Sequence, residues 1–263
     1  MKNYNIEPEA QQLTKFDERW YRKLTDKKKG TYKVVPGVTT YLEAYPKGIG
    51  YDLWLMNTKD PYAVRDEAGQ LGTETHKLIE LTLHGEMAEY FDGQTRIEAW
   101  ERYLSWCIWW KTFTKENKVS YEKDWIEHIT WNDTDEYAGT VDLIASVNDK
   151  IEIFDWKTGS FVGDTAEIQV SAYAESVGLE FNKQIMIANI VQLNPKLNKK
   201  GVRVREINRE EILSNFEDFK HVQKIWKREN KNAKPKFLTY PTKVDLKYIQ
   251  NNEIVIINKN IGE

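Results

Sequence analysis

Three charged residues near the ends of two apolar segments have the types and spacing of a cation site. Asp142 lies in the segment GTVDLI, and Asp155 and Lys157 lie in the segment IEIFDWKTG. The second segment begins like a buried strand and then carries a carboxylate and an ammonium where apolar residues would continue. Carboxylate oxygens are the ligands that Mg²⁺ prefers in proteins, so the two aspartates are candidate ligands of a divalent cation.

A two-residue hairpin loop at 148–149 would bring the two carboxylates together. Such a loop pairs Val147 with Lys150. Counting back along both strands then places Asp142 directly opposite Asp155. Opposed residues have Cβ atoms about 4.5–5.5 Å apart, and like charges at this distance destabilise a sheet unless something positive lies between them. This register therefore predicts a cation between the two strands.

Two other arrangements are compatible with the same residues. A three-residue loop would place Asp142 opposite Trp156 and separate the two acids by face. Alternatively, Asp155 pairs with Lys157 as a salt bridge on the sheet surface, while Asp142 caps a turn. In the two-residue register Lys157 lies on the acidic face, about 6.6 Å further along the strand, with Thr140 opposite it.

The segments around these residues alternate between helical and strand-like patterns. Apolar residues at helical spacing predict helices over 60–85, 95–117, 164–178 and 209–231. Apolar residues at a period of two predict strands over 120–131, 136–147, 151–157 and 184–193. This order predicts an α/β protein with a central mixed sheet flanked by helices.

The first part of the chain is expected to add helices to this core. Residues 8–24 are interpreted as a helix, residues 31–37 as a strand with a turn, and residues 39–45 as a short helix after the Pro36–Gly37 break. We expect one domain over 1–263. Its parts would be a helix-rich region (1–118), a catalytic sheet core (119–208), and a C-terminal helix and tail (209–263).

Composition excludes several classes of protein. Charged residues make up 30% and aromatic residues 13% of the 263 residues, a profile of folded rather than disordered chains. The single cysteine, Cys107, excludes an intramolecular disulfide and a four-cysteine zinc or iron–sulfur site. No segment approaches the roughly 20 apolar residues of a membrane span. We expect a cytoplasmic protein, in the host cytoplasm if it is encoded by a phage, with no membrane partner.

The charge distribution leaves room only for a local nucleic-acid site. The formal net charge is −3, so the chain as a whole does not indicate binding to a polyanion. Basic runs of this kind are usually solvated faces, but one of them is a candidate track for phosphates. Its residues are Lys196, Lys199, Lys200, Arg203 and Arg205.

The motifs and their order resemble one known superfamily. The segments GTVDLI (139–144), IEIFDWKTG (151–159) and QVSAY (169–173) resemble the PD-(D/E)XK nucleases, specifically the RecB-like branch with its Gln-x-x-x-Tyr helix. The segment GTETH (72–76) is similar to the Gly-x-x-x-His motif of that branch. The overall layout, with VPGVTTYL near the start, resembles phage-type and mitochondrial genome-maintenance exonucleases.

The resemblance implies a fold, an activity and a set of site residues. It implies a restriction-endonuclease-like core and a metal-dependent deoxyribonuclease, in particular an exonuclease of DNA recombination, repair or replication. The implied partners are single- or double-stranded DNA and a recombination or replication protein. The matching positions are the metal-binding acids Asp142 and Asp155, the catalytic lysine Lys157, the metal ligand His76, and the catalytic helix pair Gln169 and Tyr173.

Each residue on the two helices also has a structural interpretation. Without the resemblance, His76 would be an exposed helix histidine; with it, Glu80 four residues later is a candidate partner for the imidazole ring. Gln169 and Tyr173 share one helix face, an arrangement that a packed tyrosine beside a solvated glutamine would also give.

The metal and a third carboxylate follow from the same pattern. If residues 132–135 close a four-residue loop, Glu127 lies opposite Thr140 and joins the acidic face. Mg²⁺ suits oxygen ligands, and a histidine ligand makes Mn²⁺ a good alternative. An iron–sulfur cluster is excluded because the chain lacks the cysteines. Alternative functions are a structure-specific endonuclease and a catalytically silent DNA-binding accessory protein of the same fold.

Overall fold

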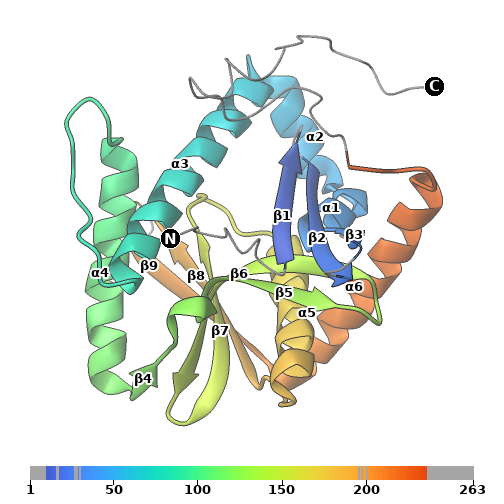
Figure 1. The fold of residues 1–263 in the computed structure, drawn as a ribbon. Helices are drawn as coiled ribbons and strands as arrows, with labels where there is room; N and C mark the ends of the chain where they lie inside the picture. The colour runs from blue at the N-terminus through green and yellow to red at the C-terminus, as the bar shows by residue number, and fades with distance from the viewer. Residues whose placement is uncertain are drawn as a thin grey trace, which may run out of the picture.

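A six-stranded mixed sheet between two helical layers forms the body of the protein (Figure 1). The computed structural model describes residues 10–15, 18–26, 29, 31–194, 196, 198–199 and 201–235. The strands of this sheet are β4 (Val119–Ser120), β5 (Ile126–Asn132), β6 (Tyr137–Val147), β7 (Lys150–Lys157), β8 (Ile187–Leu193) and β9 (Val202–Asn208). Their order is β4-β6-β7-β8-β9, and β5 also pairs with β6. The predicted α/β class with a central mixed sheet is confirmed.

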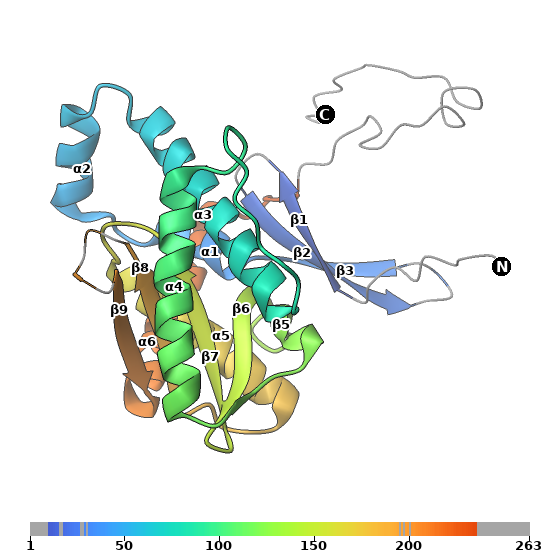
Figure 2. The ribbon, with the colours of Figure 1, turned by 90° about the vertical axis from the view of Figure 1, so that its left-hand side faces the viewer.

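Helices cover both faces of this sheet (Figures 1 and 2). The covering helices are α3 (Pro61–Leu83) and α4 (Ile97–Glu116) on one face and α5 (Asp164–Phe181) and α6 (Arg209–Glu229) on the other. The described chain also has the helices α1 (Val38–Tyr41) and α2 (Gly48–Asn57), of which α2 has no buried residue, and short 3₁₀ turns at Leu42–Ala44 and Lys123–Trp125. Ile144 and Ile153 pack in one apolar cluster with α5 and α6. Leu143 and Phe154 pack in another with α3 and α4. Because successive strand residues face opposite ways, β6 and β7 each supply both clusters.

The predicted helices and strands of the body agree with the structure to within a few residues, except for the strand predicted over 120–131. That segment is divided into β4, the 3₁₀ turn at Lys123–Trp125 and β5. One boundary differs in an informative way: Gly178, the predicted end of α5, lies inside the helix, which continues to Phe181 and ends at Asn182 with a φ of 48°. Gly178 has another use there. A Cβ on it would lie 2.8 Å from the carbonyl oxygen of Lys183, so the glycine allows the chain to pass close to the helix.

The N-terminal segment is a sheet, not the predicted helix over 8–24. The strands β1 (Ala10–Lys15), β2 (Glu18–Asp26) and β3 (Thr31–Pro36) form a separate antiparallel sheet, which stands beside the body (Figure 2). Tyr21 is buried in a small cluster with Val35 and Trp131. Pairing with β3 and this burial outweigh the helical propensity of the segment. The N-terminal helices are α1 to α4, of which the sequence pattern did not indicate α2.

The hairpin between β6 and β7 has the predicted register. Val147 pairs with Lys150, and the pairing continues to Leu143 opposite Phe154. The three-residue-loop alternative is therefore wrong. Beyond Leu143 and Phe154 the two strands part: β6 continues beside β5, and β7 continues beside β8 in parallel. The two acids of the sequence motif follow directly at this point of separation.

Replacing Gly139 by Ala should lower the free energy of unfolding by about 1–3 kcal/mol, the usual cost of forcing extra atoms into a packed core. A Cβ at this position would lie 2.2 Å from Cε1 of Tyr173, whose side chain is buried. Urea unfolding of the purified variant measures the change. Gly69→Ala is the matched control, since nothing lies within 4 Å of its added Cβ, and it should be neutral or stabilising. Equal midpoints for the two variants would contradict the close packing of Tyr173 on β6.

Candidate active site

Asp142 and Asp155 lie where β6 and β7 separate, and both side chains are buried. The backbone N–H of Trp156 donates to Oδ2 of Asp142 at 2.6 Å. The carboxylate thus accepts the hydrogen bond that a neighbouring strand would otherwise accept. Asp142 does not cap a turn, so that half of the salt-bridge alternative is wrong.

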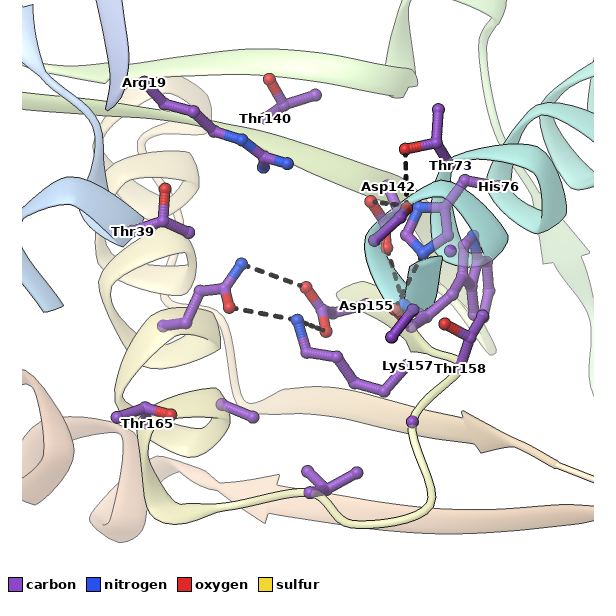
Figure 3. A pocket seen from close by; sticks show the side chains of 18 of the residues that line it. Arg19, Thr39, Thr73, His76, Thr140, Asp142, Asp155, Lys157, Thr158 and Thr165 are labelled. Atoms are coloured by element: carbon purple, nitrogen blue, oxygen red, sulfur yellow. Dashed lines mark hydrogen bonds and ion pairs between the residues drawn. The ribbon is translucent and has the colours of Figure 1, made fainter. Parts of the chain in front are cut away.

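His76 is brought to this point by α3. Its Nδ1 lies 3.4 Å from Oδ1 of Asp142, and its Nε2 lies 3.0 Å from the carbonyl oxygen of Trp156 (Figure 3). The carbonyl can only accept, so Nε2 carries the proton and Nδ1 faces the carboxylate. The predicted partner Glu80 does not hold this ring; it pairs with Lys77 at 2.9 Å. A backbone carbonyl sets the orientation instead.

The third member of the group is Glu127 on β5. The predicted register, with Glu127 opposite Thr140, is wrong by two residues, because Ile129 lies opposite Thr140. The four-residue loop is 133–136, since Asn132 already pairs with Tyr137. A shift of two residues keeps the same face, so Glu127 still joins the acids. It has a φ of 49°, in the left-handed region that a glutamate rarely adopts.

These three side chains form a compact set of metal-ligand atoms. One ligand atom each from His76, Glu127 and Asp142 lie within 4.8 Å of one another. Two carboxylates with an imidazole suit a divalent cation that accepts both oxygen and nitrogen. The residues present therefore fit a divalent metal.

Burial and mutual repulsion shift the ionisation of this group. Burial opposes the charged form of His76, but Asp142 outweighs it and raises the pKa of His76 to about 9. Burial would raise the pKa of Asp142, yet His76 and Lys157 hold it below its usual range. Burial, reinforced by Asp142, raises the pKa of Glu127 to about 8. Without a metal, the site thus holds one carboxylate that resists ionisation near neutral pH.

Asp155 belongs to a second, adjoining network. Its Oδ2 lies 2.7 Å from Nζ of Lys157, and Nζ also donates to Oε1 of Gln169 at 3.1 Å. The amide nitrogen of Gln169 donates to the hydroxyl of Tyr173 at 2.9 Å and lies 3.5 Å from Oδ1 of Asp155. Gln169 is therefore not merely solvated: it connects the lysine with Tyr173. Burial raises the pKa of Asp155, with Lys157 opposing and Asp142 reinforcing the shift.

Both networks line one open cleft of about 820 Å³. Its walls come from β2, α3, the separating ends of β6 and β7, and the start of α5. Arg19 on β2 points into this cleft toward the acids (Figure 3). Within the described residues its guanidinium has no hydrogen bond or ion pair, although its backbone is held by Thr40 and Gly37. Sequence reasoning missed Arg19, since the segment was taken for a helix.

The predicted basic track is only partly available to a ligand. Arg203 and Arg205 lie on β9, where they line a second pocket of about 190 Å³. Arg205 is already paired with Glu167 at 3.1 Å and with Glu211 at 2.5 Å. Lys196 and Lys199 lie in the connection before β9, and Lys200 lies outside the described residues.

Comparisons with known proteins add a faint likeness of fold. No protein-family model matches the chain, and no curated protein matches it. Among solved structures, the crystal structure of SSO0001 is similar with a TM-score of 0.28 and 15% identity, covering 59% of this chain and 72% of that one. The crystal structure of LHK-Exo in complex with dAMP is similar with a TM-score of 0.28 and 10% identity, covering 75% and 93%. Among the described helices, none has the length and apolar character needed to cross a membrane.

Replacing Glu127 by Gln should remove a pH-dependent loss of stability in metal-free protein. The pKa of Glu127 is raised from 4.5 to about 8 on folding, so its contribution is fully present below about pH 4.5 and is lost as the pH rises through about 8. Thermal melts in chelator at about pH 5 and about pH 9 should therefore differ more for wild type than for the variant. A divalent metal should raise the melting temperature of wild type more than that of Glu127→Gln.

The exposed Glu122 supplies the control. Glu122→Gln lies outside the cleft and should keep both the pH dependence and the metal response of wild type. If Glu127→Gln behaves like this control in both measurements, the pKa of Glu127 is not raised on folding and Glu127 is not a metal ligand.

Proposed function

We propose that the protein is a metal-dependent deoxyribonuclease, and specifically an exonuclease that hydrolyses DNA phosphodiester bonds in recombination, repair or replication. One observation carries the proposal: the metal-ligand group of His76, Glu127 and Asp142 adjoins the Asp155–Lys157–Gln169 network in a single open cleft. The order of these residues along the chain is that of the RecB-like nucleases. We take residues 1–263 as one nuclease domain, acting in the cytoplasm.

The acidic side of the cleft would hold the metal. His76, Glu127 and Asp142, together with the adjoining Asp155, would bind Mg²⁺ or Mn²⁺. When bound, such an ion neutralises charge on the phosphate and lowers the pKa of a bound water. The hydrogen bond from His76 to the Trp156 carbonyl keeps Nδ1 turned toward the carboxylates, as the outer partner of a ligating histidine does.

Lys157 would act on the reacting phosphate. An ammonium has three donors: one donates to Gln169, and Asp155 lies beside the ammonium at ion-pair distance. The remaining N–H is available to an attacking water or to an oxygen of the phosphodiester, where its charge stabilises the transition state. Gln169 and Tyr173 are positioning residues in this scheme, because they fix the lysine through Oε1 of the glutamine.

The cations at the edges of the cleft would hold the DNA. Arg19 lies across from the acids with a guanidinium that no described residue pairs with, which suits a phosphate next to the cleavage point. The basic residues around β9 would extend this track over further phosphates. DNA and a recombination or replication protein are the partners in this proposal.

Asp142→Ala, Asp155→Ala and Lys157→Ala should each lower metal-dependent cleavage by about a hundredfold to a thousandfold or more, because each removes a charge from the reacting centre. Cleavage of end-labelled linear DNA with Mg²⁺ or Mn²⁺ measures the effect. Binding of the same DNA in chelator should stay within about threefold of wild type, since the phosphate track lies elsewhere.

A matched ion pair outside the cleft provides the control. Lys118 and Asp149 pair at 2.8 Å on the exposed surface, so replacing either by Ala should leave cleavage unchanged. Near wild-type turnover of any of the three cleft variants would overturn the site assignment. Blocked-end and circular DNA should resist digestion; their cleavage would show an endonuclease, and intact linear DNA under every metal would show a binding protein without this activity.

A further inference from the structure

Phe161 stands at the edge of the cleft with its side chain in solvent. Its exposed fraction is 84%, the highest among the exposed large apolar side chains in the described part of the chain. Leaving a phenylalanine in water forgoes the favourable free energy of burying its ring. The neighbouring Val162 packs against the core instead, so the loop between β7 and α5 turns one apolar residue inward and the other outward.

The loop that carries Phe161 is fixed by contacts from both helical and sheet elements. Gln192 on β8 donates to the carbonyl oxygen of Gly159 at 2.9 Å, and Arg102 on α4 donates to that of Thr158 at 3.0 Å. The phenylalanine ring lies over Gly163, where a Cβ would come 3.3 Å from Cε1 of the ring. The ring is therefore presented by a held backbone.

Phe161 separates two sites of different chemistry. On one side is the cleft with His76, Asp142 and Lys157; on the other is the smaller pocket with Arg203. Within the described residues Arg203 makes no ion pair or hydrogen bond through its guanidinium, in contrast to Arg205 two residues later. An exposed ring thus stands between a proposed phosphate-cleaving centre and a free guanidinium.

We propose that Phe161 is a stacking platform for a nucleobase of single-stranded DNA, and that Arg203 binds a phosphate of the same strand. The inference rests on the proposed function and names its substrate class. A base in a duplex is stacked and paired within the helix, so an exposed ring can stack on a base only in a single strand or a frayed end. Rows of cations interrupted by aromatic rings are the usual surface for such strands.

The test measures binding in chelator, where no cleavage occurs. Phe161→Ala should weaken the affinity for a fluorescein-labelled single-stranded oligonucleotide by about 5- to 100-fold, the range that loss of one base–aromatic stack gives. The affinity for a blunt, blocked duplex of equal length should stay within about twofold. Phe161→Trp should bind the single strand like wild type. Phe161→Leu, which keeps apolar bulk without a π face, should bind it as weakly as Phe161→Ala.

Further variants locate the effect on the surface. Phe91→Ala is the matched control, because Phe91 is also an exposed phenylalanine but lies outside both pockets. It should bind both DNAs like wild type. Arg203→Ala should weaken single-strand binding and reduce its salt dependence by about one phosphate contact.

The outcomes separate this inference from the proposed function. Equal losses on single strand and duplex, full rescue by Leu, or unchanged binding by Phe161→Ala would each overturn the stacking role, even if wild type cleaves DNA with metal. Conversely, selective loss of single-strand binding in chelator would support it even if no metal gives cleavage.

Discussion

The backbone of Trp156 is the point on which the site depends. Its N–H donates to the side chain of Asp142 and its carbonyl accepts from His76, so the two backbone polar groups of one residue orient two members of the metal-ligand group. Where a strand separates from its neighbour, its backbone N–H and C=O groups on that side lose their hydrogen-bond partners. A buried backbone group without a partner costs about as much free energy as a lost hydrogen bond. Here two side chains take over the role of the missing strand. The site therefore lies where β6 and β7 separate, and its side chains make the hydrogen bonds that the separation leaves open.

The residues around Trp156 explain why the carboxylates of Asp142 and Asp155 can be buried. Asp142 is balanced by His76, and Asp155 by Lys157, so each buried carboxylate has a cationic partner. Among the described residues Glu127 makes no ion pair of its own, although His76 and Arg19 lie near enough to oppose the rise of its pKa, and it occupies a strained backbone conformation. Strain and repulsion of this kind persist only where the surrounding fold enforces them, and they concentrate at functional sites. The same features that weaken the free protein are the ones that a bound cation would relieve.

Sequence reasoning succeeded where the decisive interactions are local or periodic. The placement of Asp142 and Asp155 at adjoining points of β6 and β7 follows from a short hairpin and the period of two, although the strands stop pairing one residue earlier, at Leu143 and Phe154. The placement of His76 on a long helix follows from apolar spacing. The offset of Glu127 was less accessible, because the segment 132–137 allows loops that differ by two residues while keeping the same face.

Other parts of the site depend on contacts that leave no mark in the local pattern. The ring of His76 is held by the backbone carbonyl of Trp156, eighty residues away in sequence. Every residue has a backbone carbonyl, so no side-chain motif can indicate this contact. Arg19 reaches the cleft only because β2 pairs with β3 and Tyr21 packs against Trp131. That pairing depends on tertiary contacts, which outweigh the local helical propensity of residues 8–24.

The length of the turn between β6 and β7 determines which face of the sheet each of the two acids occupies. Asn148 and Asp149 both have positive φ, 49° and 69°, as a two-residue turn of this hand requires. The turn lies about 20 Å from Asp142 along the strand, and neither of its residues lines the cleft. Inserting or deleting one codon there would nevertheless turn one acid to the opposite side of the sheet, while exchanging either residue for glycine would not. Over evolutionary time this exposed turn should therefore be conserved in length and keep residues that accept positive φ, such as Asn, Asp and Gly.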